Sequence, residues 1–227
     1  MNWLTTWRNA RRRRKLEARR PGEIFSEYFA SNKWGDDESV SGKGSNLAST
    51  ARLRTILPQI LRDLGARSLL DVPCGDFHWM AHVDLDGIAY TGGDIVPALI
   101  ERNRARHSRD GVTFQVIDLI AGPVPRADVI FCRDCLVHLS NAHVLAALAN
   151  IRRSGATWLL TTTFPESGTN ADIATGQWRP VDLTKPPFSL PAPQQMFRET
   201  YSGEKGQQAD KMLGLWRIGD LPDIGSA

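Results

Sequence analysis

Apolar residues in the chain follow two alternating spacings from residue 46 onward. The first segment has the 3.6-residue spacing of a helix, ends at Gly65, and is followed by a continuous apolar run over residues 68–72. Its apolar positions are Leu47, Leu53, Ile56, Leu57, Ile60, Leu61 and Leu64. The pattern predicts one helix followed by one buried strand.

The same alternation continues to residue 164. We expect strands over residues 88–92, 112–117, 128–132 and 157–164, and helices over residues 77–82, 97–107 and 141–152. Short apolar strands separated by helices are typical of a parallel sheet covered on both faces through right-handed crossovers. The predicted class is α/β, with a doubly wound and mostly parallel sheet.

Beyond residue 164 the alternation stops, and a proline-rich run precedes two further candidate strands. These cover residues 195–201 and 211–218, and the turn-rich segment SGEKGQQAD lies between them. The arrangement predicts an antiparallel hairpin that completes a seven-stranded sheet.

Length and charge divide the chain into three parts. With 227 residues, 41% of them hydrophobic, the chain can form one core, which we assign to residues 46–227. Residues 21–45 are polar, glycine-rich and aromatic, so we expect a lid. Residues 1–20 hold eight Arg or Lys against one acid, a net charge of +7, which leaves −4 for the rest of the chain. We expect this basic arm to be solvated, with contact to an anionic surface through residues 8–20 as the alternative.

The sequence contains no apolar window of the ~20 residues that a membrane-spanning helix needs, and no apolar segment of a secretory signal follows the basic residues. The three cysteines, Cys74, Cys132 and Cys135, are an odd number, which favours free thiols in a reducing compartment. We therefore expect a cytoplasmic protein.

Candidate ligand-binding residues follow the predicted strands. In a doubly wound sheet, ligands bind outside the carboxyl ends of the strands. Asp71 closes the first strand, Asp94 closes the second and Asp118 follows the third. An acid after the second strand is suited to the two hydroxyls of a ribose, which several adenosine cofactors carry.

The first turn, LLDVPCGDFHW, chooses among these cofactors. A diphosphate needs backbone N–H groups and small residues, whereas this turn offers Pro73, the anion Asp76 and the bulky Phe77 around a single glycine, Gly75. S-adenosylmethionine has no phosphate, and its ammonium and sulfonium groups favour acids and aromatic faces. The turn therefore predicts S-adenosylmethionine.

Four motifs in order, LLDVPCGDF, YTGGDIVPALI, VTFQVIDLI and ADVIFCRDCLVHL, resemble the class I (Rossmann-like) S-adenosylmethionine-dependent methyltransferases over residues 46–164. Pro73 and Phe77 depart from the pattern, since many members have glycine at both positions. The resemblance implies cofactor contacts at Asp71, Gly75 and Asp76 for the methionine end, Asp94 and Ile95 for the ribose, Asp118 and Leu119 for the adenine, and Arg133 beside the sulfonium.

Methyl transfer needs a base only if the acceptor must lose a proton. His138 and Asp134 follow the fourth strand, where the acceptor should lie, and are our catalytic candidates. The alternative is that Asp134 caps a helix and His138 only packs.

Other reactive side chains indicate packing rather than chemistry. Cys132 and Cys135 have the spacing of a redox pair, but one further cysteine is too few for a four-cysteine zinc site, so we expect structural thiols. His78 and His82 lack the glutamate of a zinc-protease helix and are expected to pack or face solvent. We predict no metal site.

One group of residues is a candidate for the acceptor side, with a structural loop as the alternative. It follows the fifth strand and consists of Phe164, Glu166, Asn170, Asp172, Trp178 and Arg179. Its mixture of aromatic and polar groups suits a polar small molecule or a glycan, and we expect methylation at oxygen. The alternatives to such a methyltransferase are a nicotinamide-dependent oxidoreductase and a nucleic-acid or membrane binding module tethered by the arm.

A second group belongs to the lid, where we expect Trp34, Glu38, Ser41 and Ser45 to close over the cofactor and Gly42 and Gly44 to permit the bend.

Overall fold

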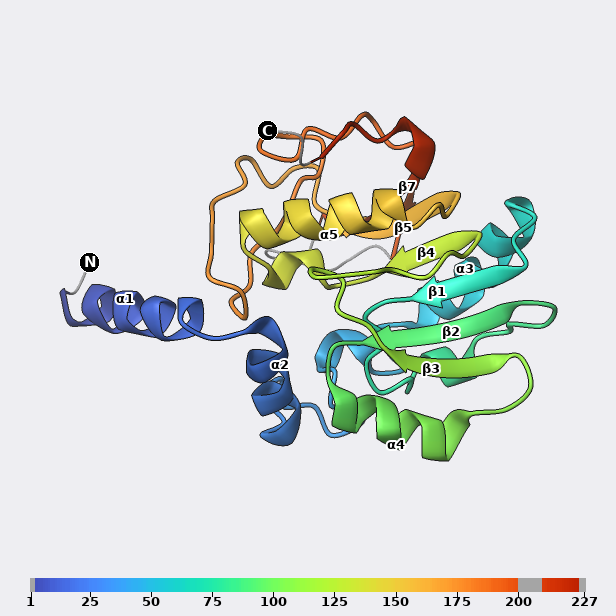
Figure 1. The fold of residues 1–227 in the computed structure, drawn as a ribbon, viewed down its shortest axis with the longest axis horizontal. Helices are drawn as coiled ribbons and strands as arrows, with labels where there is room; N and C mark the ends of the chain where they lie inside the picture. The colour runs from blue at the N-terminus through green and yellow to red at the C-terminus, as the bar shows by residue number, and fades with distance from the viewer. Residues whose placement is uncertain (1–2, 200–209, 225–227) are drawn as a thin grey trace.

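The computed structural model describes residues 3–199 and 210–224 and shows an α/β fold built on one seven-stranded sheet (Figure 1). The strand order is β3-β2-β1-β4-β5-β7-β6, and only β7 runs antiparallel, pairing with β5 and β6. The strands are β1 (Ser68–Asp71), β2 (Ala89–Asp94), β3 (Val112–Val116), β4 (Val129–Cys132), β5 (Trp158–Thr163), β6 (Gln195–Arg198) and β7 (Met212–Arg217). The predicted doubly wound, mostly parallel sheet is confirmed.

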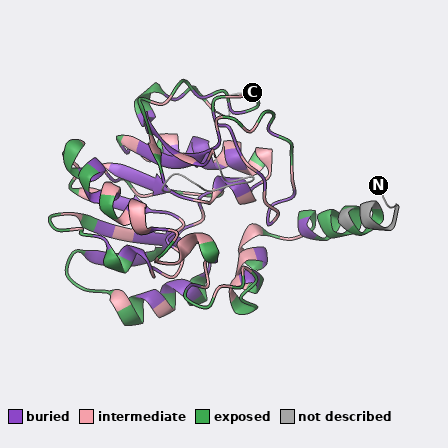
Figure 2. Ribbon diagram, turned by 180° about the vertical axis from the view of Figure 1, so that it is seen from behind, coloured by how far each residue is buried: buried purple, intermediate pink, exposed green. Residues whose placement is uncertain are grey.

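Three helices cover the two faces of the sheet (Figure 1). They are α3 (Ala51–Asp63), α4 (Pro97–His107) and α5 (Asn141–Arg153). Successive side chains of a strand point to opposite faces, so Leu70 packs in the cluster under α5 while Leu69 packs in the cluster under α3. Figure 2 shows that the central strands are buried.

The predicted elements differ from the structure mainly at their ends. Helix α3 begins at Ala51 rather than at Leu47, because Asn46 forms a turn in which its side chain accepts from the Ser49 N–H. No α-helix forms over residues 77–82. Phe77 has a φ of +58°, which a helix does not allow, and only Met80–His82 forms a single 3₁₀ turn. Further 3₁₀ turns are Lys43–Ser45, Leu136–His138 and Ile218–Asp220.

The sequence did not predict two helices that precede the sheet, α1 (Trp3–Glu17) and α2 (Pro21–Ala30). Proline at the first position of α2 lacks the N–H that a helix start leaves unpaired. Helix α1 extends away from the body and is mostly exposed (Figure 2), but Leu16 near its end is buried against Ile24 and Tyr28 of α2. The basic arm is thus a helix, attached to the body through its last turn.

The predicted C-terminal hairpin is confirmed by the pairing of β6 with β7. Most of the predicted turn between them, and the extension of the first strand to Tyr201, lie outside the described residues. No described helix is both long and apolar enough to span a membrane.

Candidate active site

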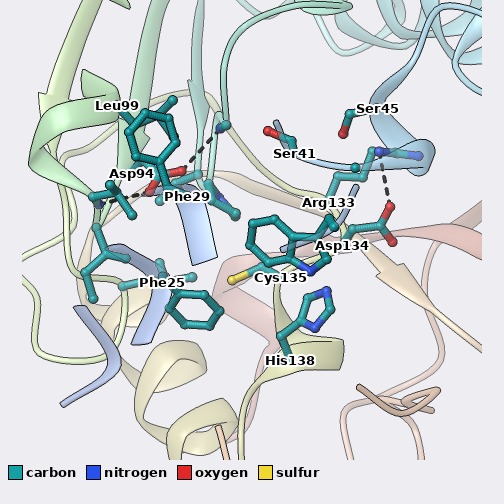
Figure 3. Close-up of a pocket in the computed structure, with 18 of the residues that line it drawn as sticks. Phe25, Phe29, Ser41, Ser45, Asp94, Leu99, Arg133, Asp134, Cys135 and His138 are labelled. Atoms are coloured by element: carbon teal, nitrogen blue, oxygen red, sulfur yellow. Dashed lines mark hydrogen bonds and ion pairs between the residues drawn. The ribbon is translucent and has the colours of Figure 1, made fainter. Parts of the chain in front are cut away.

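A cavity of about 380 Å³ lies at the carboxyl ends of the parallel strands, between the sheet and residues 25–45 (Figure 3). The ends of β1, β2 and β4 are level with one another, because Asp71 pairs with Gly92 on one side and with Phe131 on the other. This is the switch point of the sheet, and the volume is within the range of small-molecule sites. Eight predicted site residues line the cavity, namely Gly75, Asp94, Ile95, Asp118, Leu119, Arg133, Asp134 and His138.

Asp94 is fixed at the end of β2 by two backbone hydrogen bonds. Its Oδ1 accepts from the Val96 N–H at 3.0 Å and its Oδ2 from the Gly75 N–H at 3.3 Å. Each carboxylate oxygen keeps a further lone pair for a donor in the cavity. Burial raises the pKa of Asp94 to about 6, although these hydrogen bonds oppose the rise.

The wall beside Asp94 is apolar. It consists of Phe25, Phe29, Val96, Leu99, Ile117 and Leu119. Asp118 completes this side, and its Oδ1 accepts from the N–H groups of Ile120 at 2.8 Å and Ala121 at 3.1 Å, which fixes the turn after β3. A slot with apolar walls and one polar edge is suited to a purine ring.

Gly75, in the turn after β1, lies directly against Ser41 of the lid. Its φ is +54°, and a Cβ at this position would lie 2.2 Å from Ser41 Oγ. Its carbonyl accepts a hydrogen bond from the Asn103 side chain at 2.7 Å. Glycine is therefore required both by the backbone conformation and by the absence of space.

Asp71 is not among the residues that line the cavity, in contrast to our expectation. It is buried beside Tyr90, whose hydroxyl donates to its Oδ2 at 2.7 Å. Burial raises the pKa of Asp71 to about 7, against the effects of the Tyr90 hydrogen bond and the Arg133 charge. Phe77 lies on the same side, with its ring 5.1 Å from those of Tyr90 and Phe114, so it does not fill the cavity.

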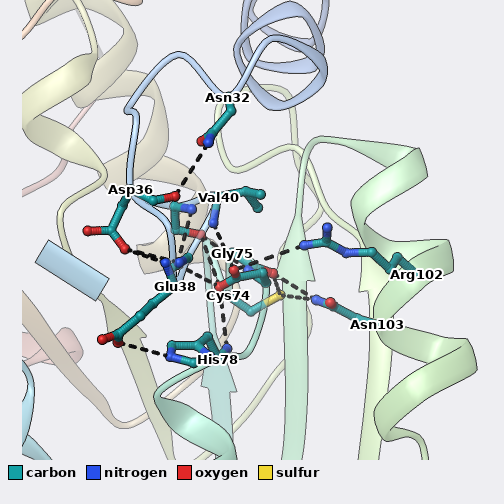
Figure 4. A network of polar contacts seen from close by, with 12 residues as sticks. Asn32, Asp36, Glu38, Val40, Cys74, Gly75, His78, Arg102 and Asn103 are labelled. Carbon is teal, nitrogen blue, oxygen red and sulfur yellow. Dashed lines mark hydrogen bonds and ion pairs between the residues drawn. The ribbon is translucent and has the colours of Figure 1, made fainter. Parts of the chain in front are cut away.

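Asp76 also does not line the cavity. Its carboxylate instead binds residues 39–41 of the lid, in a polar network that joins the lid to the turn after β1 (Figure 4). It accepts from Ser39 Oγ at 3.0 Å, the Val40 N–H at 3.0 Å and Ser41 Oγ at 3.4 Å. The lid is thus connected directly to the turn after β1.

Four charged side chains form a cluster at the floor of the cavity, three of them buried and the fourth, Asp134, 31% exposed. Arg133 donates to Glu199 at 2.7 Å and contacts Asp134 at 3.1 Å, while Lys211 contacts Asp134 at 2.6 Å and Glu199 at 3.2 Å. Arg133 also donates to the carbonyl of Gly44 in the lid at 2.9 Å. Two cations and two anions offset one another, which burial requires.

This cluster decides the chemistry of Asp134. Burial alone would raise its pKa, but Arg133 and Lys211 outweigh burial and lower the pKa to about 2. Its backbone has a φ of +52° and its N–H donates to Thr162 Oγ1 at 2.9 Å, so it does not cap a helix. A carboxylate with so low a pKa is a weak base. No local pattern predicts a role for Glu199 or Lys211, which lie far along the chain from Asp134.

His138 keeps the properties of a base. Its Nδ1 lies 3.0 Å from the carbonyl oxygen of Gln177, which places the proton on Nδ1 and leaves the lone pair on Nε2. Burial lowers the pKa of His138, so the ring is neutral near pH 7. The loop after β5 fixes the turn, because the Gly176 N–H donates to the His138 carbonyl at 2.8 Å and the Arg179 N–H to the Val137 carbonyl at 3.0 Å.

Some of the candidates from the loop after β5 and from the lid line the cavity, and others do not. Of the residues after β5, Trp178 lines the cavity, whereas Phe164 and Asn170 are buried elsewhere and Arg179 supports the turn of His138. Lid residues Trp34, Ser41, Gly42, Gly44 and Ser45 line the cavity, whereas Glu38 accepts from the Leu47 N–H at 2.9 Å.

Of the remaining reactive side chains, Cys135 lines the cavity, whereas Cys132, His78 and His82 do not. Cys132 and Cys135 are free thiols, and the Cys135 pKa is raised by its hydrogen bond to Cys132 and by burial. His78 lies 3.4 Å from Glu38 rather than sharing a ligand with His82. Within residues 3–199 and 210–224, no cluster of three or more acids, histidines or cysteines is arranged to hold a metal ion.

Comparison with known proteins agrees with this geometry. Residues 69–155 match the methyltransferase domain family. This range contains both the turn after β1 and His138. The fold is similar to that of the N-methyltransferase NodS from Bradyrhizobium japonicum WM9, at 14% identity and a TM-score of 0.59 over 84% of this chain and 97% of that one. The matched segment thus lies within a fold that the chain shares with solved S-adenosylmethionine-dependent methyltransferases. No curated protein matches its sequence significantly.

Two further methyltransferases of similar fold have been solved with cofactor or its product. Magnesium protoporphyrin IX methyltransferase from Synechocystis PCC 6803, with S-adenosylhomocysteine, is 17% identical, with a TM-score of 0.50 over 65% of this chain and 74% of that one. Human N-acetylserotonin methyltransferase, with S-adenosylmethionine, is 13% identical, with a TM-score of 0.50 over 87% of this chain and 65% of that one. The chain spans under two thirds of the length of some of these solved structures, 65% of the human enzyme and 64% of the bacterial CtHen1 methyltransferase domain.

Proposed function

We propose that the protein transfers the methyl group of S-adenosylmethionine to an oxygen atom of a polar small molecule or a glycan. The observation that carries this proposal is the position of His138. A neutral imidazole, with its Nδ1 held by the Gln177 carbonyl, lines the cavity opposite the cofactor wall formed by Asp94 and Leu119. A base in this place is needed for a hydroxyl acceptor, which must lose its proton.

The cavity fits this cofactor and does not fit a dinucleotide. Asp94 offers two fixed acceptors for a ribose, and the apolar slot beside Asp118 offers room for adenine. Pro73 lines the cavity where a diphosphate would need an N–H donor. In this proposal Gly75, Asp94, Ile95, Asp118 and Leu119 contact the cofactor directly. Asp71 and Asp76 support the site without touching the cofactor, since Asp71 accepts a hydrogen bond from Tyr90 and Asp76 accepts hydrogen bonds from the lid.

Bound S-adenosylmethionine supplies a methyl group already activated by its sulfonium. The protein aligns the acceptor for in-line attack, and alignment of this kind reaches effective molarities of ~10⁵ M or more. His138 Nε2 accepts the acceptor's proton. Asp134 remains an anion held by Arg133 and Lys211, and contributes negative charge near the sulfonium rather than proton transfer.

Aromatic and polar groups together support a hydroxylated acceptor. Trp34 and Trp178 line the cavity on the side of His138, and the Trp34 ring lies 5.9 Å from the His138 ring. Flat aromatic faces bind the apolar faces of sugars and rings, while the nearby hydroxyl of Ser45 is available as a polar partner. We place the enzyme in the cytoplasm, where its three free thiols would persist.

Substitution of His138 tests the proposal. His138→Gln should slow methyl transfer from labelled S-adenosylmethionine to fractionated cell extract by about 10²-fold or more, while the Kd for S-adenosylhomocysteine stays unchanged. His143→Gln is the matched control, because His143 lies outside the cavity, where its Nδ1 forms a hydrogen bond of 2.6 Å with Thr175 Oγ1. In the wild type, kcat should fall as the pH drops through a value below 6.5, where Nε2 becomes protonated. Unchanged turnover in His138→Gln would remove the base from the mechanism.

A further inference from the structure

A second cavity, of about 580 Å³ and more open to solvent, lies beside the first. The two cavities share three residues, Trp34, His138 and Trp178. Because His138 belongs to both walls, a molecule in the second cavity has its reacting end next to the proposed base. The second cavity is therefore in the position of an acceptor site.

The wall of this cavity is fixed by packing around Gly176. Tyr28 donates to the Gly176 carbonyl at 2.9 Å, and the Gly176 N–H donates to the His138 carbonyl at 2.8 Å. Gly176 has a φ of +96°, and a Cβ there would lie 2.7 Å from Ile24 and 3.4 Å from Leu16. Helices α1 and α2 and the turn of His138 thus meet at this glycine.

The charged residues on this wall are cations. Arg12 of α1 and Lys33, which follows α2, line the cavity, and no acid is among its lining residues in the described chain. Arg12 is one turn before Leu16, so the contact that buries Leu16 also brings Arg12 to the cavity. Neither side chain has a hydrogen bond or ion pair with any described residue.

Three acids on the neighbouring elements already have cationic partners. Arg13 contacts Glu17 at 2.7 Å and Asp172 at 3.6 Å, and Arg19 contacts Glu27 at 2.6 Å. Arg12 and Lys33 themselves are exposed at the cavity and are not paired with any of these three acids. Around the cavity stand three aromatic side chains, Tyr28, Trp34 and Trp178.

We propose that the second cavity binds the acceptor and that Arg12 and Lys33 recognise an anionic group on it, a carboxylate or a phosphate. This inference rests on the proposed function and names its substrate class, an anionic hydroxylated molecule. The anion is a recognition group and remains in the product. At the other end of the acceptor, the oxygen forms a bond to the methyl carbon as the carbon–sulfur bond breaks. The hydroxyl proton passes to His138 Nε2, and S-adenosylhomocysteine leaves.

The first experiment measures binding without turnover. Glucose 6-phosphate, glucuronate and glucose are titrated into the protein saturated with S-adenosylhomocysteine, with calorimetric detection. One or both anions should bind at least about tenfold more tightly than glucose, and Arg12→Gln/Lys33→Gln should remove that difference. Arg8→Gln/Arg14→Gln is the matched control, because it removes the same two positive charges from the protein but touches neither cavity.

The second experiment identifies the charge of the product. Labelled product formed in cell extract should be retained by an anion exchanger, and phosphatase treatment of the extract distinguishes a phosphate from a carboxylate. The Arg12/Lys33 double variant should raise KM about tenfold or more, with kcat and the Kd for S-adenosylhomocysteine unchanged.

Three results would overturn the inference: equal binding of the anions and glucose, a neutral labelled product, or an equal loss in the control variant. Absence of S-adenosylhomocysteine binding would instead contradict the proposed function.

Discussion

Carboxylates at the ends of neighbouring strands differ widely in how readily they take up a proton. Asp134, held by two cations, has a pKa lowered to about 2, whereas burial raises the pKa of Asp71 to about 7. Asp71 ends β1 and Asp134 follows β4, which are neighbours in the sheet. Their partners cause the difference, because Asp71 receives one neutral hydroxyl and Asp134 receives two charged groups.

Asp71 should make the stability of the protein depend on pH. Its pKa is higher in the folded chain than in the unfolded chain, so the folded state binds more protons between pH 4 and pH 7 and loses stability as the pH rises through about 7. Asp71→Asn should therefore raise the free energy of unfolding at pH 8 and change it less at pH 5. Urea unfolding at both pH values measures this, and an equal effect at both would contradict the assigned pKa.

Lys211 should be important for stability despite its distance from the cofactor wall. Lys211→Met leaves two acids, Asp134 and Glu199, with a single cation, and breaking a buried pair in this way costs roughly 3–5 kcal/mol. Lys185→Met is the control, because Lys185 pairs with Asp182 at 3.0 Å but is 41% exposed, and its loss should cost under about 1 kcal/mol. Urea unfolding at pH 7 compares the two variants, and equal losses would rule out the cluster as a structural centre.

At the scale of elements, the lid is held in two ways: α2 packs in a small hydrophobic cluster with Leu16 and Ala174, and the segment after it is bound by one acid of the first turn. Asp76 accepts hydrogen bonds from three consecutive lid residues, Ser39, Val40 and Ser41. Arg133 reaches the other side of the lid through the carbonyl of Gly44. The division into an arm (1–20), a lid (21–45) and a catalytic domain (46–227) remains a prediction, but these contacts show which residues connect its parts.

Loss of Asp76 should weaken cofactor binding although Asp76 does not line the cavity. Asp76→Ala removes the acceptor of several hydrogen bonds to the lid, so we expect the Kd for S-adenosylhomocysteine to rise about tenfold and proteolysis between residues 31 and 50 to accelerate. Asp86→Ala is the control, since Asp86 is exposed and lies in the following loop. Calorimetry and limited proteolysis are the measurements. A weaker Kd without faster proteolysis would indicate direct contact with the cofactor instead.

At the scale of the whole molecule, the fold could be predicted from the sequence more completely than the site. Continuous apolar runs located the parallel strands and the 3.6-residue spacing located helices α3 to α5, because strands buried on both faces are apolar throughout and helices are apolar on one side. Helices α1 and α2 were not predicted. Among its described side chains, α1 buries only Leu16, and most of its other residues are charged, so no apolar spacing is visible.

The site was predicted only where a side chain's direction follows from its strand. Asp71 was misplaced because alternation puts it on the face of Leu69, beside Tyr90, rather than toward the cavity. Asp76 was misplaced because Phe77 turns the chain with a positive φ. Glu199 and Lys211 join Arg133 only through folding, at separations that no local pattern encodes.

Ligand binding by the whole domain distinguishes the two enzyme classes that the sequence leaves open. S-adenosylhomocysteine should raise the melting temperature at concentrations at least about tenfold below those at which NAD has any effect, because the cavity lacks donors for a diphosphate. Removal of the ligand by dialysis should restore the original value. A shift with NAD alone would instead favour the oxidoreductase.

The order of strands at one end of the sheet has a consequence for how the chain is made. Strand β7 lies between β5 and β6 in the sheet. During synthesis, β6 therefore emerges before β7, the strand with which it pairs. The backbone N–H and C=O groups along one side of β5 remain unpaired until β7 has been made. A nascent or shortened chain that ends before Met212 would present that open edge to other chains, and unpaired edges of this kind promote aggregation. Completion of the polypeptide, rather than ligand, is what closes the sheet.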